Sequence, residues 1–130
     1  MEKVLITGAS GYIALHCIVE CLKSGYLVKA SLRNMDREDE VRQAIRKETD
    51  DSNLEICKLD LLDDEGWEDA AWDCDYLLHT ASPFITYEPK DENELIKPAK
   101  EGTLRALRAA NKAGIKKIVL TSSIAAIAYA

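Results

Sequence analysis

Small residues at regular spacing follow the first apolar run of the sequence. The apolar residues 4–6 lead into 7–14, whose sequence is Thr-Gly-Ala-Ser-Gly-Tyr-Ile-Ala. Gly8 permits a tight turn, and Gly11 leaves no Cβ between the backbone and a ligand. Ala14 lets the following helix pack closely on the strands, and the first amides of that helix can bind an anion. This spacing predicts a loop that binds the diphosphate of a dinucleotide, with a plain turn as the alternative.

The end of the second apolar run carries a cation instead of an acid. Residues 26–32 are followed by Arg33, and no carboxylate stands at this tip. At this place in a dinucleotide-binding sheet, a carboxylate accepts from the ribose 2′-hydroxyl, whereas a guanidinium pairs with a 2′-phosphate. Arg33 therefore favours NADP(H), with NAD(H) as the alternative cofactor. The competing interpretation is a solvated arginine at the entrance of the charged helix that begins near residue 36.

Small and polar residues also follow the later apolar runs. Asp60 follows the run 54–59, Thr80 comes shortly after 76–78, and Ser123 comes shortly after 117–120. Asp60 is equally explained as a solvated acid in an acidic run, and serines after a strand are ordinary turn residues. His79 continues a buried strand, so we interpret it as a hydrogen-bonded core histidine and not as an acid or base.

Apolar runs and helical patterns alternate along the whole chain. Strands are expected at 4–6, 26–32, 54–59, 76–78 and 117–120, and helices at about 12–24, 36–48 and 95–113. A further short helix, with Asp63 as its cap, is expected to carry Trp67, Ala70 and Ala71. Such alternation indicates a parallel sheet that is covered by helices on both faces. The sequence thus predicts an α/β fold, a Rossmann-type doubly wound sheet of about five strands in the order 3-2-1-4-5. Ligands bind such sheets where the strand order reverses, at strand one.

The spacing Thr-Gly-x-x-Gly-x-x-Ala over 7–14 resembles the extended branch of the short-chain dehydrogenase/reductase superfamily. Three further segments resemble its dihydroflavonol-reductase-like group, within the NAD-dependent epimerase/dehydratase superfamily: His-Thr-Ala-Ser-Pro-Phe at 79–84, Ile-Lys-Pro-Ala-Lys-Glu-Gly-Thr at 96–103, and Thr-Ser-Ser at 121–123. The resemblance implies one NAD(P)-binding Rossmann domain over 1–130 and an NADPH-dependent reduction of an aldehyde or ketone. A small carbonyl compound would be the substrate.

This resemblance also implies roles for particular residues. The expected cofactor contacts are Gly8, Ser10, Gly11, Tyr12, Ile13, Arg33, Asp60, Leu61, Thr80, Ala81, Ser82 and Thr121. Asp60 is expected to accept a hydrogen bond from the adenine amine. Ser123 is the expected catalytic residue, whose hydroxyl would bind the substrate carbonyl.

The proton donor of the family has no counterpart in the sequence. That donor is a Tyr assisted by a Lys four residues later, and none of the five tyrosines here is followed by Lys at that distance. We therefore expect a domain truncated before the Tyr-x-x-x-Lys segment and the substrate-binding portion. The alternatives are a sugar-nucleotide epimerase or dehydratase, and a non-catalytic NAD(P)-binding or sensing module. Ala99, where many epimerases have Asn, favours the reductases.

Length and composition limit the other possibilities. The 130 residues suit one domain, and 47% hydrophobic residues supply a core, which excludes disorder. The net charge of −6, with scattered basic residues, argues against a nucleic-acid partner, and no apolar run suits a membrane span. The four cysteines lack Cys-x-x-Cys spacing, so we expect no metal and a cytoplasmic location. Homodimers are common in the family and are a further expectation.

Overall fold

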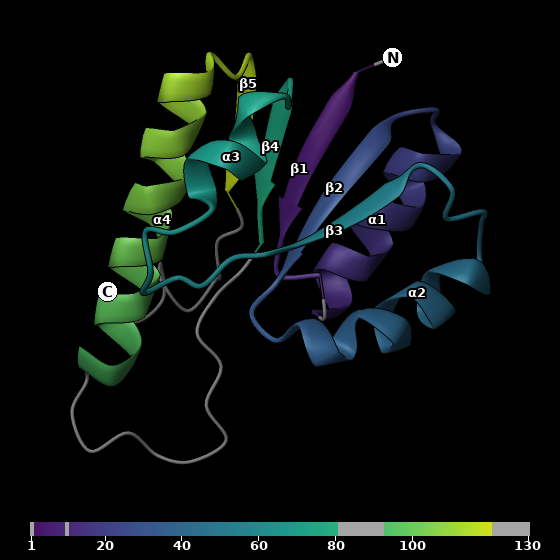
Figure 1. Ribbon diagram of the computed structural model, residues 1–130, viewed down its shortest axis with the longest axis horizontal. Helices are drawn as coiled ribbons and strands as arrows, with labels where there is room; N and C mark the ends of the chain where they lie inside the picture. The colour runs from purple at the N-terminus through teal and green to yellow at the C-terminus, as the bar shows by residue number, and fades with distance from the viewer. Residues whose placement is uncertain (1, 10, 81–92, 121–130) are drawn as a thin grey trace, which may run out of the picture.

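The structure, a computed structural model, describes residues 2–9, 11–80 and 93–120. Its elements are β1 (Lys3–Thr7), α1 (Tyr12–Lys23), β2 (Leu27–Leu32), the 3-10 helix η1 (Met35–Arg37), α2 (Glu38–Arg46), β3 (Leu54–Lys58), α3 (Trp67–Trp72), β4 (Tyr76–His79), α4 (Asn93–Ala113) and β5 (Lys117–Leu120). The five strands form one parallel sheet in the order β3-β2-β1-β4-β5 (Figure 1). The predicted fold class and strand order are confirmed. In the described part of the chain, no helix has the length and apolar character needed to cross a bilayer.

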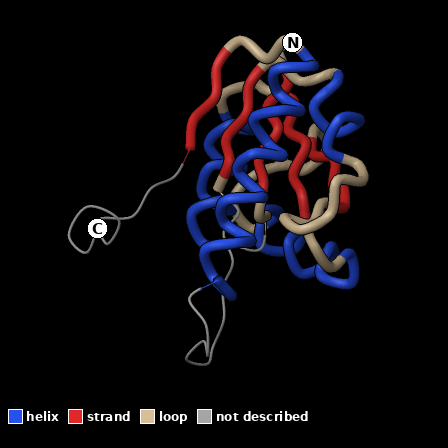
Figure 2. The backbone as a smooth tube through the Cα atoms, turned by 90° about the vertical axis from the view of Figure 1, so that its left-hand side faces the viewer, coloured by secondary structure: helices blue, strands red, loops and turns tan. Residues whose placement is uncertain are grey.

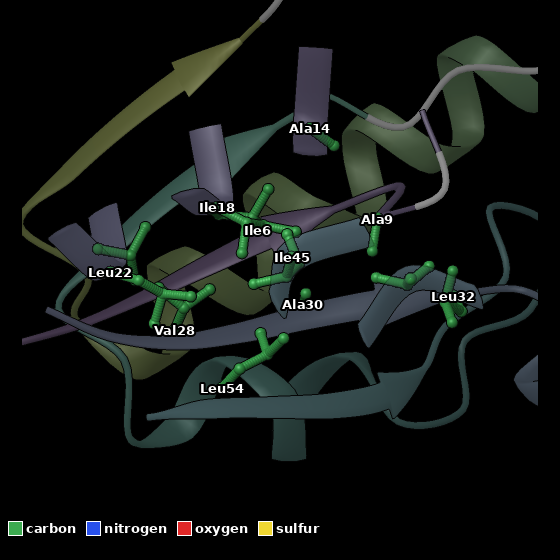
Figure 3. Close-up of a cluster of buried hydrophobic side chains, with 12 residues drawn as sticks. Ile6, Ala9, Ala14, Ile18, Leu22, Val28, Ala30, Leu32, Ile45 and Leu54 are labelled. Carbon is green, nitrogen blue, oxygen red and sulfur yellow. The ribbon is translucent and has the colours of Figure 1, made fainter. Parts of the chain in front are cut away.

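Helices cover both faces of the sheet, as expected. Helices α1 and α2 pack on one face and α3 and α4 on the other (Figure 1), and in the view turned by 90° the helices run alongside the strands (Figure 2). Successive residues of β1 serve the two faces in turn, because side chains alternate along a strand. Val4 and Ile6 belong to the core cluster of α1 and α2, whereas Leu5 belongs to the cluster of α3 and α4. Figure 3 shows Ile6 in the first of these clusters.

The expected helix over 36–48 is divided into two elements. Asn34 accepts a hydrogen bond from the Asp36 N–H through its side-chain oxygen at 3.0 Å, and this contact begins the separate 3-10 helix η1. Helix α2 follows and buries Val41 and Ile45, two apolar residues whose spacing of four places them on one face of the helix. The apolar pattern therefore predicted the buried face of α2 but not its first residue.

Helix α3 begins after Gly66 and not after Asp63, so the expected cap is wrong. The Asp63 carboxylate instead accepts the N–H of Glu65 at 3.0 Å within the preceding loop. Gly66 caps the helix with a φ of 87°, a conformation that favours glycine. Three residues separate Asp63 from Trp67, the first residue of α3, so its side chain serves the loop and not the helix.

A buried cation ties α3 to the sheet. Lys29 on β2 is 6% exposed, and its ammonium donates to the Asp73 carboxylate at 2.7 Å and to the Ala70 carbonyl at 3.2 Å. Lys3 on β1 donates to the same carboxylate at 2.7 Å. Asp73 directly follows α3, so these bonds hold the end of that helix against two strands.

Candidate functional site

The carboxyl ends of β1 to β4 meet at one edge of the sheet. Thr7, which ends β1, pairs with His79, which ends β4, and Leu32 at the end of β2 pairs with Lys58 at the end of β3. Ligands of such sheets bind at this edge. The described residues that follow these strand ends include most of the expected cofactor contacts, namely Gly8, Gly11, Tyr12, Ile13, Arg33, Asp60, Leu61 and Thr80.

The turn between β1 and α1 has the shape that the glycines predicted. Gly8 has a φ of 76°, and its carbonyl accepts the N–H of Gly11 at 2.9 Å. The first intrahelical bond runs from the Leu15 N–H to the Gly11 carbonyl at 3.0 Å. The amides of residues 12–14 precede this bond, as the first amides of every α-helix do, and such amides bind anions. The turn therefore presents a helix N-terminus at the ligand-binding edge.

Side chains at the start of α1 divide between the solvent and the core. Tyr12 is 78% and Ile13 57% exposed, so both are accessible at the mouth of the turn. Ala14 is 1% exposed and belongs to the core cluster between α1 and the sheet (Figure 3), which is the close packing expected of it. Tyr12 also places its ring edge against His16, with 4.5 Å between the ring centroids.

Ser31 holds the turn from the neighbouring strand, which the sequence analysis missed. Its carbonyl accepts the N–H of Ala9 at 2.8 Å, and its hydroxyl oxygen accepts the N–H of Gly8 at 3.2 Å. The side chain is 3% exposed. A polar residue between the buried apolar Ala30 and Leu32 was the available signal, but the sequence does not show which atoms a buried hydroxyl meets.

A second polar link joins β1 to β4. The Thr7 hydroxyl lies 2.9 Å from His79 Nδ1 and accepts the N–H of Thr80 at 3.0 Å, while the Thr80 hydroxyl donates to the Thr7 carbonyl. His79 is 5% exposed, and burial lowers its pKa below the ordinary value. The interpretation of His79 as a hydrogen-bonded core histidine is confirmed. The two hydrogen bonds between Thr80 and Thr7 hold Thr80 next to the residue that precedes the glycine turn.

Arg33 lies exposed directly after β2. Within the described residues, no ion pair or side-chain hydrogen bond engages its guanidinium. The next arginine along the chain differs, because Arg37 pairs with the Glu40 carboxylate through two contacts of 3.0 and 3.1 Å. Arg33 is thus a cation at the ligand-binding edge that the described part of the protein leaves uncompensated.

The segment after β3 is fastened to α4. Asp60 accepts the N–H of Leu62 through its carboxylate at 3.0 Å, and its carbonyl accepts from the indole N–H of Trp67 at 3.0 Å. Arg105 of α4 donates to the Leu61 carbonyl at 2.6 Å. The Asp60 carboxylate thus serves a local turn, and one carboxylate oxygen accepts no hydrogen bond from the described residues.

The close contact of Gly102 with Leu61 explains why the segment 96–103 has glycine at this position of α4. A Cβ at this position would lie 2.9 Å from the Leu61 Cβ and would overlap the end of the Leu61 side chain. Glycine is therefore required where the segment after β3 crosses the helix.

Five expected site residues lie outside the described residues: Ser10, Ala81, Ser82, Thr121 and Ser123. The described part of the site thus comprises the β1–α1 turn, the end of β2, the segment after β3, and Thr80. The first three are the parts at which the sequence predicted the diphosphate and the adenosine of a dinucleotide. The catalytic role of Ser123 stays a prediction.

Comparisons with known proteins agree with this architecture. The model of the NAD dependent epimerase/dehydratase family matches residues 4–129. A cinnamoyl-CoA reductase from Medicago truncatula is 39% identical over 127 residues, which are 97% of this chain and 39% of that protein. A dihydroflavonol 4-reductase from Dianthus caryophyllus is 40% identical over 124 residues, 94% of this chain and 34% of that protein. The resemblance to the dihydroflavonol-reductase-like group is confirmed.

Solved structures show the same similarity. The crystal structure of the yeast methylglyoxal/isovaleraldehyde reductase complexed with NADPH matches with a TM-score of 0.82 at 29% identity, covering 95% of this chain and 38% of that chain. The chain therefore spans less than two fifths of the length of each of these three proteins.

Proposed function

The chain belongs to the NAD dependent epimerase/dehydratase family, and on this basis we propose that it is the NADP(H)-binding domain of a reductase of aldehydes or ketones. The observation that carries the proposal is an exposed Arg33 that makes no ion pair with any described residue and lies at the same sheet edge as the glycine turn. A guanidinium in this place matches a 2′-phosphate, which NADPH has and NADH lacks. The names of the relatives support the reductase class, and NADPH is the cofactor in the yeast structure.

The residues of the site suit a dinucleotide in charge and in hydrogen-bonding groups. Gly11 offers bare backbone where a Cβ would stand 3.3 Å from the Gly8 carbonyl, so a diphosphate can approach the amides of residues 12–14. The partial positive charge of the α1 N-terminus and the charge of Arg33 both stabilise a phosphate. Asp60 retains a carboxylate oxygen for the adenine amine. Each group thus complements a part of NADP(H).

Bound NADPH supplies a hydride for the carbonyl carbon of the substrate. The amides at the start of α1 orient the cofactor through its diphosphate, and Arg33 selects the phosphorylated ribose. We place Ser123 at the substrate carbonyl, where its hydroxyl would donate a hydrogen bond to the oxygen as negative charge develops. Thr80, held by Thr7, would border the cofactor between these two ends.

A binding domain without turnover is the second candidate. None of the five tyrosines is followed by Lys four positions later, so the 130 residues lack the family's assisted proton donor. We expect the 130-residue chain to bind NADPH without carbonyl-dependent oxidation. Absorbance at the nicotinamide band, followed with a panel of aldehydes and ketones, measures this, and sustained turnover would show that a different group donates the proton.

The proposal also keeps two expectations from the sequence, a cytoplasmic location and a homodimer. A reducing compartment suits the four cysteines, all of which are free thiols. Sedimentation analysis measures the oligomeric state, and a strictly monomeric protein would remove the homodimer from the proposal.

Replacement of Arg33 tests the cofactor assignment directly. Loss of a charge-assisted hydrogen bond costs about 1.5–3 kcal/mol, so we expect Arg33→Ala to weaken NADPH binding by roughly 10- to 150-fold. NADH binding should change little, because that cofactor has no 2′-phosphate. Titrations followed by nicotinamide fluorescence give both affinities.

Arg108→Ala is the matched control for this experiment. Arg108 is an exposed arginine of α4 that makes no ion pair with the described residues. We expect the control to bind both cofactors as the wild type does. Equal losses for NADPH and NADH in Arg33→Ala would refute the role of Arg33 in selectivity.

A further inference from the structure

Ser31 makes two contacts with the glycine turn from its place near the end of β2. Strand β1 ends at Thr7, and the N–H groups of the next two residues, Gly8 and Ala9, both donate to Ser31. The Ser31 carbonyl accepts from Ala9 at 2.8 Å, and the Ser31 hydroxyl oxygen accepts from Gly8 at 3.2 Å. The carbonyl contact is available to any residue at position 31. The hydroxyl contact requires Ser or Thr.

The orientation of the Gly8 amide affects the conformation of the whole turn. Successive N–H groups of an extended strand point in opposite directions, but Gly8 has a φ of 76° and both its own N–H and that of Ala9 meet Ser31. The Gly8 carbonyl in turn accepts the N–H of Gly11 at 2.9 Å. The orientation of Gly8 is therefore coupled to the place where α1 begins.

We propose that Ser31 is a positioning residue for dinucleotide binding, because its hydroxyl holds the Gly8 amide and so presets the turn that receives the diphosphate. This inference rests on the proposed function and adds a residue to it. Ser31 is 3% exposed and lies behind the turn, so it acts through Gly8 and not by touching the cofactor. A preset turn loses less conformational freedom when the ligand binds, which raises affinity.

The role of Ser31 differs from that of Arg33 in a way that binding can measure. The turn serves the diphosphate, which NADPH and NADH share, whereas Arg33 serves only the 2′-phosphate. Loss of the Ser31 hydroxyl should therefore weaken both dinucleotides equally. It should leave unchanged the binding of adenosine 2′-monophosphate, which has the 2′-phosphate but no diphosphate.

The experiment compares Ser31→Ala, Ser31→Thr and the control Ser24→Ala, in which an exposed serine at the far end of α1 is replaced. We expect Ser31→Ala to bind NADPH and NADH about fivefold more weakly, the scale of one neutral hydrogen bond. Ser31→Thr retains the acceptor and should restore most of the affinity. Ser24→Ala should match the wild type, and adenosine 2′-monophosphate should bind all four proteins alike.

Three results would overturn the inference alone: wild-type affinity in Ser31→Ala, no rescue by Ser31→Thr, or an equal loss for adenosine 2′-monophosphate, which would indicate a general structural effect. A wild type that binds neither dinucleotide would overturn the proposed function and this inference with it.

Hydrogen exchange of the Gly8 amide tests the underlying contact even if Ser31→Ala does not fold. In the wild type without ligand, the bond to Ser31 predicts exchange that is slower than in an unstructured peptide. Exchange at the peptide rate would mean that the hydroxyl does not hold the amide, and the inference would fail.

Discussion

Gly11 combines an ordinary backbone conformation with a place that leaves little room for a side chain. Its φ of −80° and ψ of 153° are open to every residue type, so the backbone conformation alone does not require glycine there. A Cβ would nevertheless lie 3.3 Å from the Gly8 carbonyl, at the mouth of the turn. A side chain at this position would therefore crowd the Gly8 carbonyl, on the turn at which we expect the diphosphate.

Gly11→Ala should separate binding from folding. We expect its thermal unfolding to stay close to that of the wild type, while NADPH and NADH bind about tenfold more weakly because the Cβ stands between the backbone and the diphosphate. Fluorescence titration and thermal unfolding measure the two effects. Adenosine 2′-monophosphate serves as the internal control and should bind unchanged. Undiminished dinucleotide affinity would contradict the placement of the diphosphate at this turn.

The residues of the site differ in how far the sequence could predict them. The turn at Gly8 and Gly11 was predictable because glycines at this spacing between a strand and a helix have few explanations. The role of Arg33 in cofactor selection stays a prediction. Ser31 was not predictable, because its two bonds to the turn join residues 22 or more positions apart and exist only in the folded sheet. A serine in a strand does not show whether it faces a turn, another strand or water.

At the scale of elements, the segment after β3 packs directly against helix α4. Leu61 packs over Gly102, and the Leu61 carbonyl accepts from Arg105, which also pairs with Asp64 at 2.7 Å. These contacts set the position of Asp60, one residue earlier. The expected contact with adenine therefore depends on a helix that lies some forty residues further along the chain.

Gly102→Ala tests this close crossing, because helix propensity and the overlap with Leu61 change the free energy of unfolding in opposite directions. Alanine favours a helix over glycine by about 1 kcal/mol, but the overlap with Leu61 costs about 1–3 kcal/mol. We expect a lower free energy of unfolding in Gly102→Ala. In a Leu61→Gly background both the Cβ and the side-chain end that cause the overlap are gone, so the same substitution should stabilise the protein. Denaturant unfolding of the four proteins measures both signs, and destabilisation in both backgrounds would exclude the proposed overlap.

Periodicity predicted the elements better than their boundaries. All five strands and four helices were expected from alternating apolar patterns, because burial on one or two faces decides those patterns. The boundaries depended on local hydrogen bonds that several residues can make. Asp63 is a residue type that commonly caps helices, yet its carboxylate accepts a hydrogen bond within the preceding loop. Gly66, three residues later, is the cap of α3.

At the scale of the whole molecule, an ion-pair cluster holds the sheet to α3 away from the site. Partial burial raises the pKa of Asp73, but hydrogen bonds from Lys29 and Lys3 outweigh this and lower it to about 2. A lowered pKa means that the cluster stabilises the fold fully above the unfolded pKa of 3.8. That contribution is lost as the pH falls toward 2.

Asp73→Asn should therefore change how the free energy of unfolding depends on pH in acid. We expect the variant to be less stable at pH 7 by about 1–3 kcal/mol, since a buried ammonium loses its charged acceptor. Between about pH 4 and pH 2 its free energy of unfolding should fall less steeply than that of the wild type. Asp69→Asn, at an exposed acid of α3, is the control and should follow the wild type. If the free energies of unfolding of Asp73→Asn and of the wild type fall equally steeply between about pH 4 and pH 2, the Asp73 carboxylate does not contribute to the acid dependence of stability.

The central claim is that the turn between β1 and α1 binds the diphosphate of NADPH. Amide spectra of the protein, recorded during titration with NADPH, test it most directly because each backbone N–H reports its own surroundings. We predict saturable shifts for Gly8, Gly11 and residues 12–14, together with Arg33, and little change in α3. Saturable shifts that leave the turn unaffected, or no shifts at millimolar NADPH, would contradict the account.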